Sequence, residues 1–176
     1  MDKHGFSRKN AVRKFNGKLL KLFTQELRLP SGIVVNLEII RHPGAALVVP
    51  FLSTNRIILL RQFRGAINEY IYELPAGTIN NSESPLACAK REILEETGFT
   101  AGKLTLLGSI YPVPGYSTEK IAIFKAERLT KGKACFEKDE IIKVMEVSKS
   151  QLRRLFLSGK INDAKTICAL ALCGWI

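Results

Sequence analysis

Many short segments rich in β-branched or aromatic residues, set against few helical patterns, constrain the fold of this chain most strongly. Gly, Pro, Asn or Ser bounds each segment, as is typical of strands, and short connections such as 53–55 suit hairpins. Because these segments do not alternate strictly with helices, they predict an α+β fold with a mixed sheet rather than a doubly wound one. The strands we expect are 33–40, 45–51, 56–63, 70–74, 104–110, 121–126 and 142–147.

The helical patterns are well delimited. The first covers residues 85–97, where Ser84 is a good N-cap, Pro85 stands in the first turn and Gly98 follows the last turn. The others are expected at 149–157, after Ser148, and at 164–172, after Asn162.

Length and composition indicate a globular protein. The 176 residues are 46% hydrophobic and 24% charged, which are globular averages. No apolar run approaches the roughly 20 residues of a membrane span, and residues 1–15 lack the apolar stretch of a signal peptide, so we expect a cytoplasmic protein without a membrane partner. The cysteines have no CxxC spacing, which disfavours a zinc site and a disulfide framework.

The net charge of +11 suggests attraction to polyanions, and basic residues crowd the first segment of the chain. A solvated basic surface explains the same charge without any partner. No aromatic residues interleave these charges in a nucleic-acid-binding pattern, so we expect no nucleic-acid partner. We divide the chain into a basic N-terminal arm with strands at 1–40 and a main domain at 41–176.

Glu92, Glu95 and Glu96 stand at positions i, i+3 and i+4 of the first expected helix. Their carboxylates therefore project from one helix face, where like charges destabilise a helix by a few tenths of a kcal/mol per pair. Clustered hard oxygen atoms are the ligands that Mg²⁺ and Mn²⁺ prefer. On spacing alone, a metal site and a solvated acidic face are equally good interpretations.

The surrounding segment resembles the Nudix box, the pattern G-x5-E-x7-R-E-U-x-E-E-x-G-U in which U is apolar. Every specified position fits. The matching residues are Gly77, Glu83, Arg91, Glu92, Ile93, Glu95, Glu96, Gly98 and Phe99.

The resemblance implies the Nudix fold, a mixed sheet sandwiched by helices, and a divalent metal site. By position, Glu92, Glu95 and Glu96 would bind Mg²⁺, with Mn²⁺ as an alternative, and the backbone carbonyl of Ala76 would be a further ligand. Such a metal polarises phosphoryl oxygens and lowers the pKa of an attacking water.

Two other residues of the box have a structural role in this resemblance. Glu83 and Arg91 would pair and hold the loop against the helix, so they would not take part in the chemistry.

Segments outside the box are similar to the ADP-ribose pyrophosphatase subfamily. The stretch 111–119 reads YPVPGYSTE and resembles a Pro-Gly loop of that subfamily. An ordinary loop between two strands is the less favoured alternative. Other matching segments are 42–45, 61–64, 73–77 and 159–166.

This resemblance implies a set of substrate-binding residues. Arg64 would contact the diphosphate or the terminal ribose, unless it is a surface arginine at a strand end. Glu73 would hydrogen-bond the substrate or cap its strand. Pro114, Gly115 and Glu119 of the Pro-Gly loop would border the substrate.

The general base of the subfamily is an acidic residue on a loop before the last strand, which here reads FEKDE at 136–140. Glu140 and Glu137 are the candidates, because a base must reach the attacking water directly. An acidic loop that is merely solvated is the competing interpretation.

The expected reaction is hydrolysis of ADP-ribose to AMP and ribose 5-phosphate. Another nucleoside diphosphate sugar, such as GDP-mannose, is the main alternative, and an RNA-directed or a non-catalytic ligand-sensing role is a weaker one. The subfamily also implies a homodimer formed through N-terminal strands, with the base stacked partly by the partner chain. Since Trp175 is the only tryptophan, Phe15, Phe23 or Phe51 would have to replace a stacking tryptophan.

Overall fold

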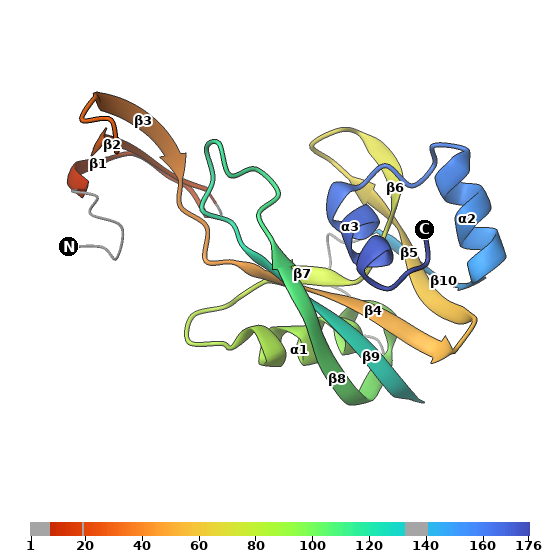
Figure 1. The fold of residues 1–176 in the computed structure, drawn as a ribbon. Coiled ribbons are helices and arrows are strands. Elements are labelled where there is room, and N and C mark those ends of the chain that lie inside the picture. The colour runs from red at the N-terminus through yellow and green to blue at the C-terminus, as the bar shows by residue number, and fades with distance from the viewer. Residues whose placement is uncertain (1–7, 19, 133–140) are drawn as a thin grey trace.

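The computed structural model describes residues 8–18, 20–132 and 141–176. A large mixed sheet lies between helices, and a separate three-stranded sheet extends from it at the N-terminal end (Figure 1). Within the described residues, no helix is long and apolar enough to cross a membrane.

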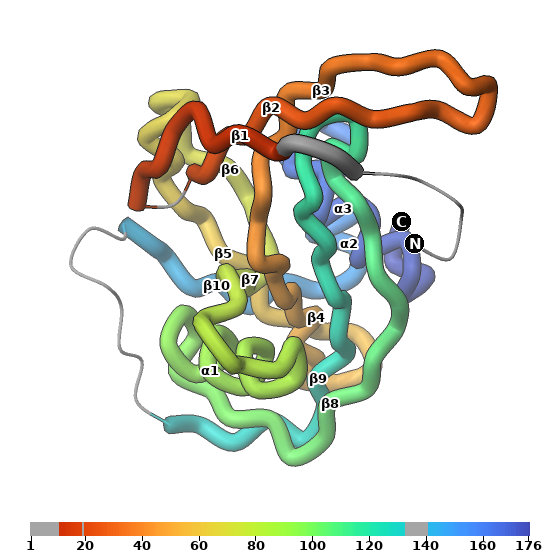
Figure 2. The backbone as a smooth tube through the Cα atoms, turned by 90° about the vertical axis from the view of Figure 1, so that its left-hand side faces the viewer, coloured from red at the N-terminus to blue at the C-terminus, as the bar shows by residue number. Residues whose placement is uncertain are grey.

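The N-terminal sheet is antiparallel and has the order β1-β2-β3. Its strands are β1 (Arg8–Asn16), β2 (Lys21–Arg28) and β3 (Val34–Ile40). Only β3 is among the strands expected from the sequence. Strand β1 carries four lysine and arginine residues among its nine, and the three apolar residues of β2 do not alternate strictly with polar ones. Both therefore show little of the alternation that marks a half-buried strand. We refer to residues 8–40 as the arm (Figure 2).

The main sheet has the order β10-β5-β4-β9-β8, with β6 added beside β5 and β7 added beside β4. Among the described strands of this sheet, only β4 and β9 pair in parallel, and the other pairs are antiparallel. Its strands are β4 (Ala45–Ser53), β5 (Arg56–Arg64), β6 (Glu69–Glu73), β7 (Ala76–Thr78), β8 (Phe99–Ile110), β9 (Ile121–Lys131) and β10 (Ile142–Ser148).

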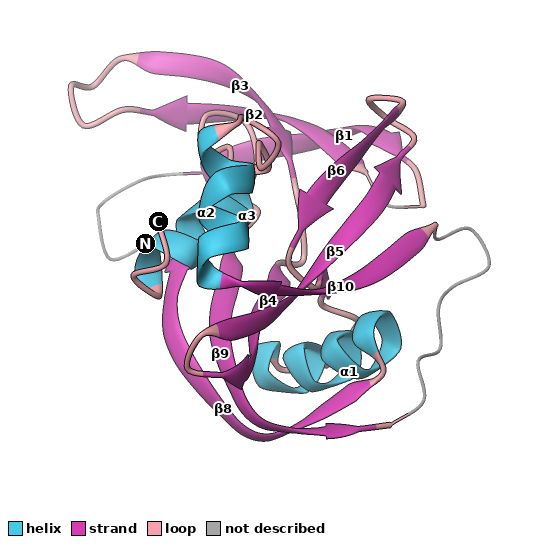
Figure 3. Cartoon of the chain, turned by 90° about the vertical axis from the view of Figure 1, so that its right-hand side faces the viewer, coloured by secondary structure: helices cyan, strands magenta, loops and turns pink. Residues whose placement is uncertain are grey.

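Strand β4 is buried on both faces, because helices cover both sides of the sheet (Figure 3). Ala46 and Val48 pack in the core beneath α1 (Pro85–Thr97). Leu47 and Val49 point the other way, into the core that α2 (Lys149–Leu157) and α3 (Ala164–Leu172) close. Alternate side chains of a strand point to opposite faces, so this continuous apolar run builds both cores at once.

The three helices have the bounds expected from the sequence, and their caps explain why. Ser84 Oγ accepts a hydrogen bond from the Ala87 N–H, and Gly98 ends α1 in the left-handed conformation with φ of 74°. Ser148 and Gln151 form a capping box at the start of α2. At the start of α3, the Asp163 side chain accepts from the Thr166 N–H.

Two connections between distant segments position the functional part of the chain. At the end of the arm, the Ile40 N–H donates to the Tyr116 carbonyl (2.7 Å), and the Thr118 N–H donates to the Ile40 carbonyl (3.0 Å). On the other side, the Leu74 N–H donates to the buried Thr166 hydroxyl (3.0 Å) and so fixes the start of α3 to the chain just after β6. The loop between β8 and β9 and the first turn of α3 therefore both border the region around β7.

Candidate active site

A cleft of about 580 Å³ opens between the arm, β7, α1, the β8–β9 loop and the start of α3. It brings together most of the side chains that the sequence singles out. Those lining it are Arg64, Ala76, Glu92, Glu95, Glu96 and Glu119.

Strand β7 lies against the carboxylate-bearing face of α1, and this contact requires glycine at position 77. A Cβ atom built on Gly77 would lie 1.7 Å from Oε1 of Glu92, so the Glu92 carboxylate would have to move from its position. The sequence did not predict β7, which is only three residues long and contains Ala and Gly, residues that are depleted in strands. Pairing with β4 forms it instead.

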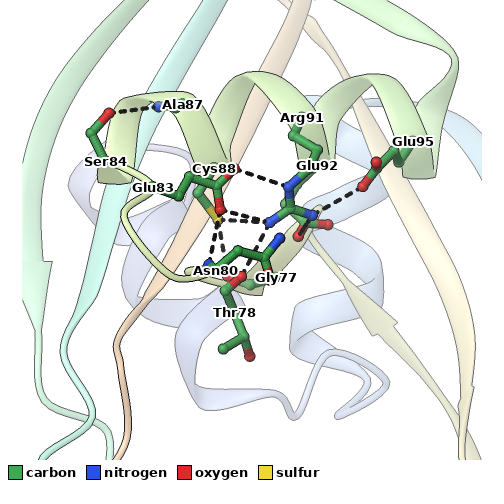
Figure 4. A network of polar contacts seen from close by, with 10 residues as sticks. All are labelled: Gly77, Thr78, Asn80, Glu83, Ser84, Ala87, Cys88, Arg91, Glu92 and Glu95. Atoms are coloured by element: carbon green, nitrogen blue, oxygen red, sulfur yellow. Dashed lines mark hydrogen bonds and ion pairs between the residues drawn. The ribbon is translucent and has the colours of Figure 1, made fainter.

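Arg91 occupies the centre of the polar network on α1 (Figure 4). Its Nε and Nη2 donate to the two carboxylate oxygens of Glu83, both at 3.0 Å, and Nη2 also donates to the Thr78 carbonyl at 3.1 Å. Nη1 donates to Glu92 and Glu95. The hydrogen bond with Glu83 is the main reason why the pKa of Arg91 is raised, and it also lowers the pKa of Glu83. The expected Glu83–Arg91 pair is thus present.

The acidic face of α1 differs in exposure from one residue to the next. Glu92 and Glu96 are buried, whereas the Glu95 side chain is about 39% exposed. Glu96 Oε2 accepts a hydrogen bond from the Ala76 N–H at 3.0 Å. Across the described parts of the chain, no three His, Cys, Asp or Glu side chains are gathered closely enough to hold a metal ion.

The hydrogen bonds of the acidic residues give a physical reason for this. Arg91 holds Glu92 and Glu95, and the backbone of Ala76 holds Glu96. The chemistry of the donor set nevertheless suits a hard divalent cation, since the glutamates of α1 line one cleft together with the residues of β7. Rotation of Glu92 and Glu95 away from Arg91 would free their oxygens for a cation.

A second charged group, which includes Arg64 and Lys165, lines the same cleft. The carboxylate of Glu73 accepts from Arg64 Nε at 2.7 Å and from Nη2 at 3.1 Å, and it also pairs with Lys165. Lys165 Nζ donates in addition to Asp163 at 2.9 Å. Burial alone would lower the pKa of Arg64, but Glu73, Glu96 and Asp163 raise it overall.

Some of the expected substrate-binding residues line the cleft and others do not. Arg64 and Glu119 line the cleft, whereas Glu73 lies behind Arg64 and is only 1% exposed. Pro114 and Gly115 do not line the cleft, although the adjacent Val113 and Tyr116 do.

Lys165 and His42 line the cleft but are not among the residues predicted to act there. Both lie in segments that resemble the subfamily, yet one lysine among 27 lysine and arginine residues carries no signal of its own. His42 Nδ1 accepts from the Gly44 N–H at 3.1 Å and lies 4.0 Å from Glu119 Oε1.

The two candidates for the general base, Glu137 and Glu140, lie outside the described residues. They remain predictions.

Cys88 lies beneath the network and is buried. Burial raises the pKa of its thiol to about 12, and the negative charge of Glu92 adds to the effect. A thiol that stays protonated is a poor nucleophile and a poor metal ligand, so Cys88 serves the packing of α1 rather than the chemistry.

Comparison with known proteins identifies this arrangement. The family model described as the NUDIX domain matches residues 41–170. The chain belongs to the Nudix family. It is 38% identical over 158 residues to the ADP-ribose pyrophosphatase of Bacillus subtilis, covering 89% of this chain and 85% of that protein. It is also 32% identical over 179 residues to the GDP-mannose pyrophosphatase of Citrobacter koseri, covering 92% and 91%.

A solved structure described as an ADP compounds hydrolase superposes on this Nudix protein with a TM-score of 0.83. The alignment covers 96% of this chain and 91% of that one at 24% sequence identity, so it shows that the two proteins share a fold. The predicted α+β Nudix fold, with a mixed sheet between helices and an N-terminal β arm, is confirmed.

Proposed function

We propose that this Nudix protein is a metal-dependent hydrolase that splits ADP-ribose and water into AMP and ribose 5-phosphate. The observation that carries the proposal is the cleft, which the acidic face of α1 and the cationic pair Arg64 and Lys165 line together. A diphosphate needs cations to neutralise its charge, and a divalent cation in turn needs the carboxylates.

Glu92, Glu95 and Glu96 would hold the metal, with the Ala76 carbonyl as a further ligand. When bound, Mg²⁺ would supply electrostatic stabilisation of the phosphoryl oxygens and acidify the attacking water, and Mn²⁺ would be an acceptable substitute. Arg91 would release two of these carboxylates and remain paired with Glu83, which keeps the loop before α1 in place.

The remaining residues would bind and orient the substrate. Arg64 and Lys165 would contact the diphosphate, and Glu119 would border the sugar or nucleoside at the other wall. Glu140, or alternatively Glu137, would accept the proton of the attacking water as the new bond to phosphorus forms and the bridging P–O bond breaks.

The substrate class rests on similarity in sequence. The Bacillus subtilis relative named for ADP-ribose has the higher identity over most of the chain, 38% against 32%. The relatives named for GDP-mannose support that sugar nucleotide as the second candidate. ADP-ribose and GDP-mannose are both nucleoside diphosphate sugars.

The partner of this chain would be a second copy of itself. The described arm forms a sheet of its own beside the cleft, and Val12 and Phe15 on β1 are 51% and 57% exposed. Exposed apolar side chains on a strand of this kind are typical of an interface between chains. We place the homodimer in the cytoplasm, as the sequence suggests.

A substrate panel tests the proposal. The purified protein would be incubated with Mg²⁺ and, separately, ADP-ribose, GDP-mannose, ADP-glucose, NADH or capped RNA, and the products separated by chromatography. AMP and ribose 5-phosphate should appear fastest from ADP-ribose and should disappear with EDTA. Faster turnover of GDP-mannose would make GDP-mannose the assigned substrate in place of ADP-ribose. A complete lack of metal-dependent turnover across the panel would contradict the proposal.

A further inference from the structure

The carboxylate of Glu73 is almost completely buried, and it bonds two cations that come from different elements. Its side chain is 1% exposed at the end of β6, whereas Arg64 ends β5 and Lys165 lies in the first turn of α3. Burying a charge costs free energy unless it is paired and hydrogen-bonded. Both oxygens of Glu73 are paired, so one carboxylate holds two cationic groups at a fixed spacing.

Both cations keep hydrogen-bond donors for a ligand. A guanidinium has five N–H donors and an ammonium has three. Among the described residues, Arg64 uses Nε and one Nη2 donor on Glu73, and Lys165 uses two donors on Glu73 and Asp163. Arg64 and Lys165 also line the cleft, with side chains 40% and 19% exposed, so their remaining donors are accessible to a ligand there.

This cationic pair lies beside the acidic face of α1. The negative charge of Glu96 contributes to the raised pKa of Arg64, and both residues line the same cleft. A phosphoryl group next to the carboxylates of α1 would therefore be within reach of the pair as well.

The fold holds Lys165 near Glu73 without relying on their ion pair. The Leu74 N–H donates to the Thr166 hydroxyl at 3.0 Å, and Asp163 caps the helix. Loss of the Glu73 charge would thus release Arg64 and leave Lys165 its pair with Asp163, while α3 stays where it is.

We propose that Glu73 is a positioning residue that holds Arg64 and Lys165 together as one diphosphate-binding clamp, and that it does not itself contact the substrate. The assignment of the diphosphate to this cleft rests on the proposed function, but the clamp has a test that needs no turnover. Cations fixed before binding lose less conformational freedom when the ligand arrives. Without the anchor, the ligand must order the Arg64 side chain and compete with Asp163 for Lys165.

Inorganic pyrophosphate in the presence of EDTA is the probe, because only protein cations can then attract it. Isothermal titration would compare the wild-type protein with Glu73→Gln and Lys165→Met. Glu146→Gln is the matched control, because Glu146 pairs with Arg56 on the surface between β5 and β10. We expect wild type and the control to bind equally, and Glu73→Gln and Lys165→Met to bind about tenfold more weakly or worse. Thermal unfolding would establish that each variant is folded.

Kinetics separate positioning from a merely structural role. With Mg²⁺ and ADP-ribose, Glu73→Gln should raise KM about tenfold while kcat changes by less than about threefold. Glu73→Asp should recover part of the loss, since it restores the charge. In a double-mutant cycle, Glu73→Gln should add little to Lys165→Met, because both remove the same clamp.

The outcomes are distinguishable. Pyrophosphate binding by Glu73→Gln that equals or exceeds that of wild type would overturn the clamp, because removal of a buried negative charge would then favour the anion. Absence of pyrophosphate binding by the wild-type protein would also overturn it. If the clamp binds pyrophosphate as expected but ADP-ribose is not hydrolysed, the clamp stands and the proposed function fails.

Discussion

At Gly77 the backbone of β7 and the carboxylate of Glu92 approach so closely that the absence of a side chain is a condition for the site. A Cβ atom there would lie 1.7 Å from Glu92 Oε1 and 2.1 Å from Cδ. Glu92 is buried and bonded to Arg91, so a shift forced by such a Cβ atom would disturb its place in the network. The close approach of β7 to the acidic face of α1 therefore depends on the absence of a Cβ atom at position 77.

Gly77→Ala should therefore displace Glu92. We expect a stability loss of about 1–3 kcal/mol from overpacking and an affinity for Mn²⁺ at least about tenfold weaker. Urea unfolding and Mn²⁺ titration measure the two effects. Gly108→Ala is the control, because its Cβ would meet only Leu172 at 3.9 Å. Equal Mn²⁺ affinity in both variants would contradict the assigned role of Gly77.

The buried Cys88 thiol should make the free energy of unfolding depend on pH. Its thiol pKa is raised to about 12 in the folded protein, above the ordinary value of 9.0. The protonated thiol thus stabilises the fold fully below pH 9, and this contribution is lost as the pH rises towards 12. Between about pH 8 and pH 10.5, the free energy of unfolding of wild type should fall by about 1–2 kcal/mol more than that of Cys88→Ala. Urea unfolding at several pH values tests this, and parallel curves would exclude the effect.

At the scale of the element, α1 and the loop before it behave as one unit because Glu83 and Arg91 tie them together. Glu83 also accepts a hydrogen bond from the Asn80 N–H at 3.0 Å, so the same carboxylate orders the loop backbone and pairs with the helix. The same guanidinium reaches Glu92 and Glu95. The pairing with Glu83 thus limits how strongly Arg91 competes with a metal for those carboxylates.

Glu83→Gln should therefore affect both stability and metal binding. Loss of the paired charge in this partly buried network should cost about 1.5–3 kcal/mol, and Arg91 should then bind Glu92 and Glu95 more firmly and weaken Mn²⁺ binding several-fold. Glu127→Gln, which alters a surface pair with Lys125 on β9, should leave Mn²⁺ binding unchanged. Stronger Mn²⁺ binding by Glu83→Gln would show that Arg91 does not compete with the metal.

At the scale of the whole molecule, the arm and the domain meet where Ile40 bonds the β8–β9 loop. The arm is a separate sheet, so most of its surface is available to another chain. We expect the wild-type protein to sediment as a dimer, and a Val12→Glu, Phe15→Glu variant to sediment as a monomer. Leu157→Glu, at a position 73% exposed on α2, is the control and should remain dimeric. A wild-type monomer at micromolar concentration would contradict the homodimer.

Short-range sequence patterns predict the helices and the buried strands of the main sheet. The helices follow from their caps, and the buried strands of the main sheet follow from their apolar runs. The bounds of β1, β2 and β7 do not follow from local composition, because pairing with neighbouring strands forms them. The carboxylates of α1 follow from helical spacing, whereas the contact between Glu73 and Lys165 joins residues 92 positions apart, and no local pattern encodes it.

The most direct test of the account compares ADP-ribose hydrolysis by wild type and by Glu96→Gln in Mg²⁺, with equal folded fractions established by thermal unfolding. Glu96→Gln keeps an oxygen that can accept the Ala76 N–H, so the fold should survive. We predict AMP and ribose 5-phosphate from wild type and a rate at least about a hundredfold lower from the variant, as loss of several kcal/mol of charge stabilisation requires. Wild-type turnover by Glu96→Gln would contradict the assignment of the metal site to the acidic face of α1.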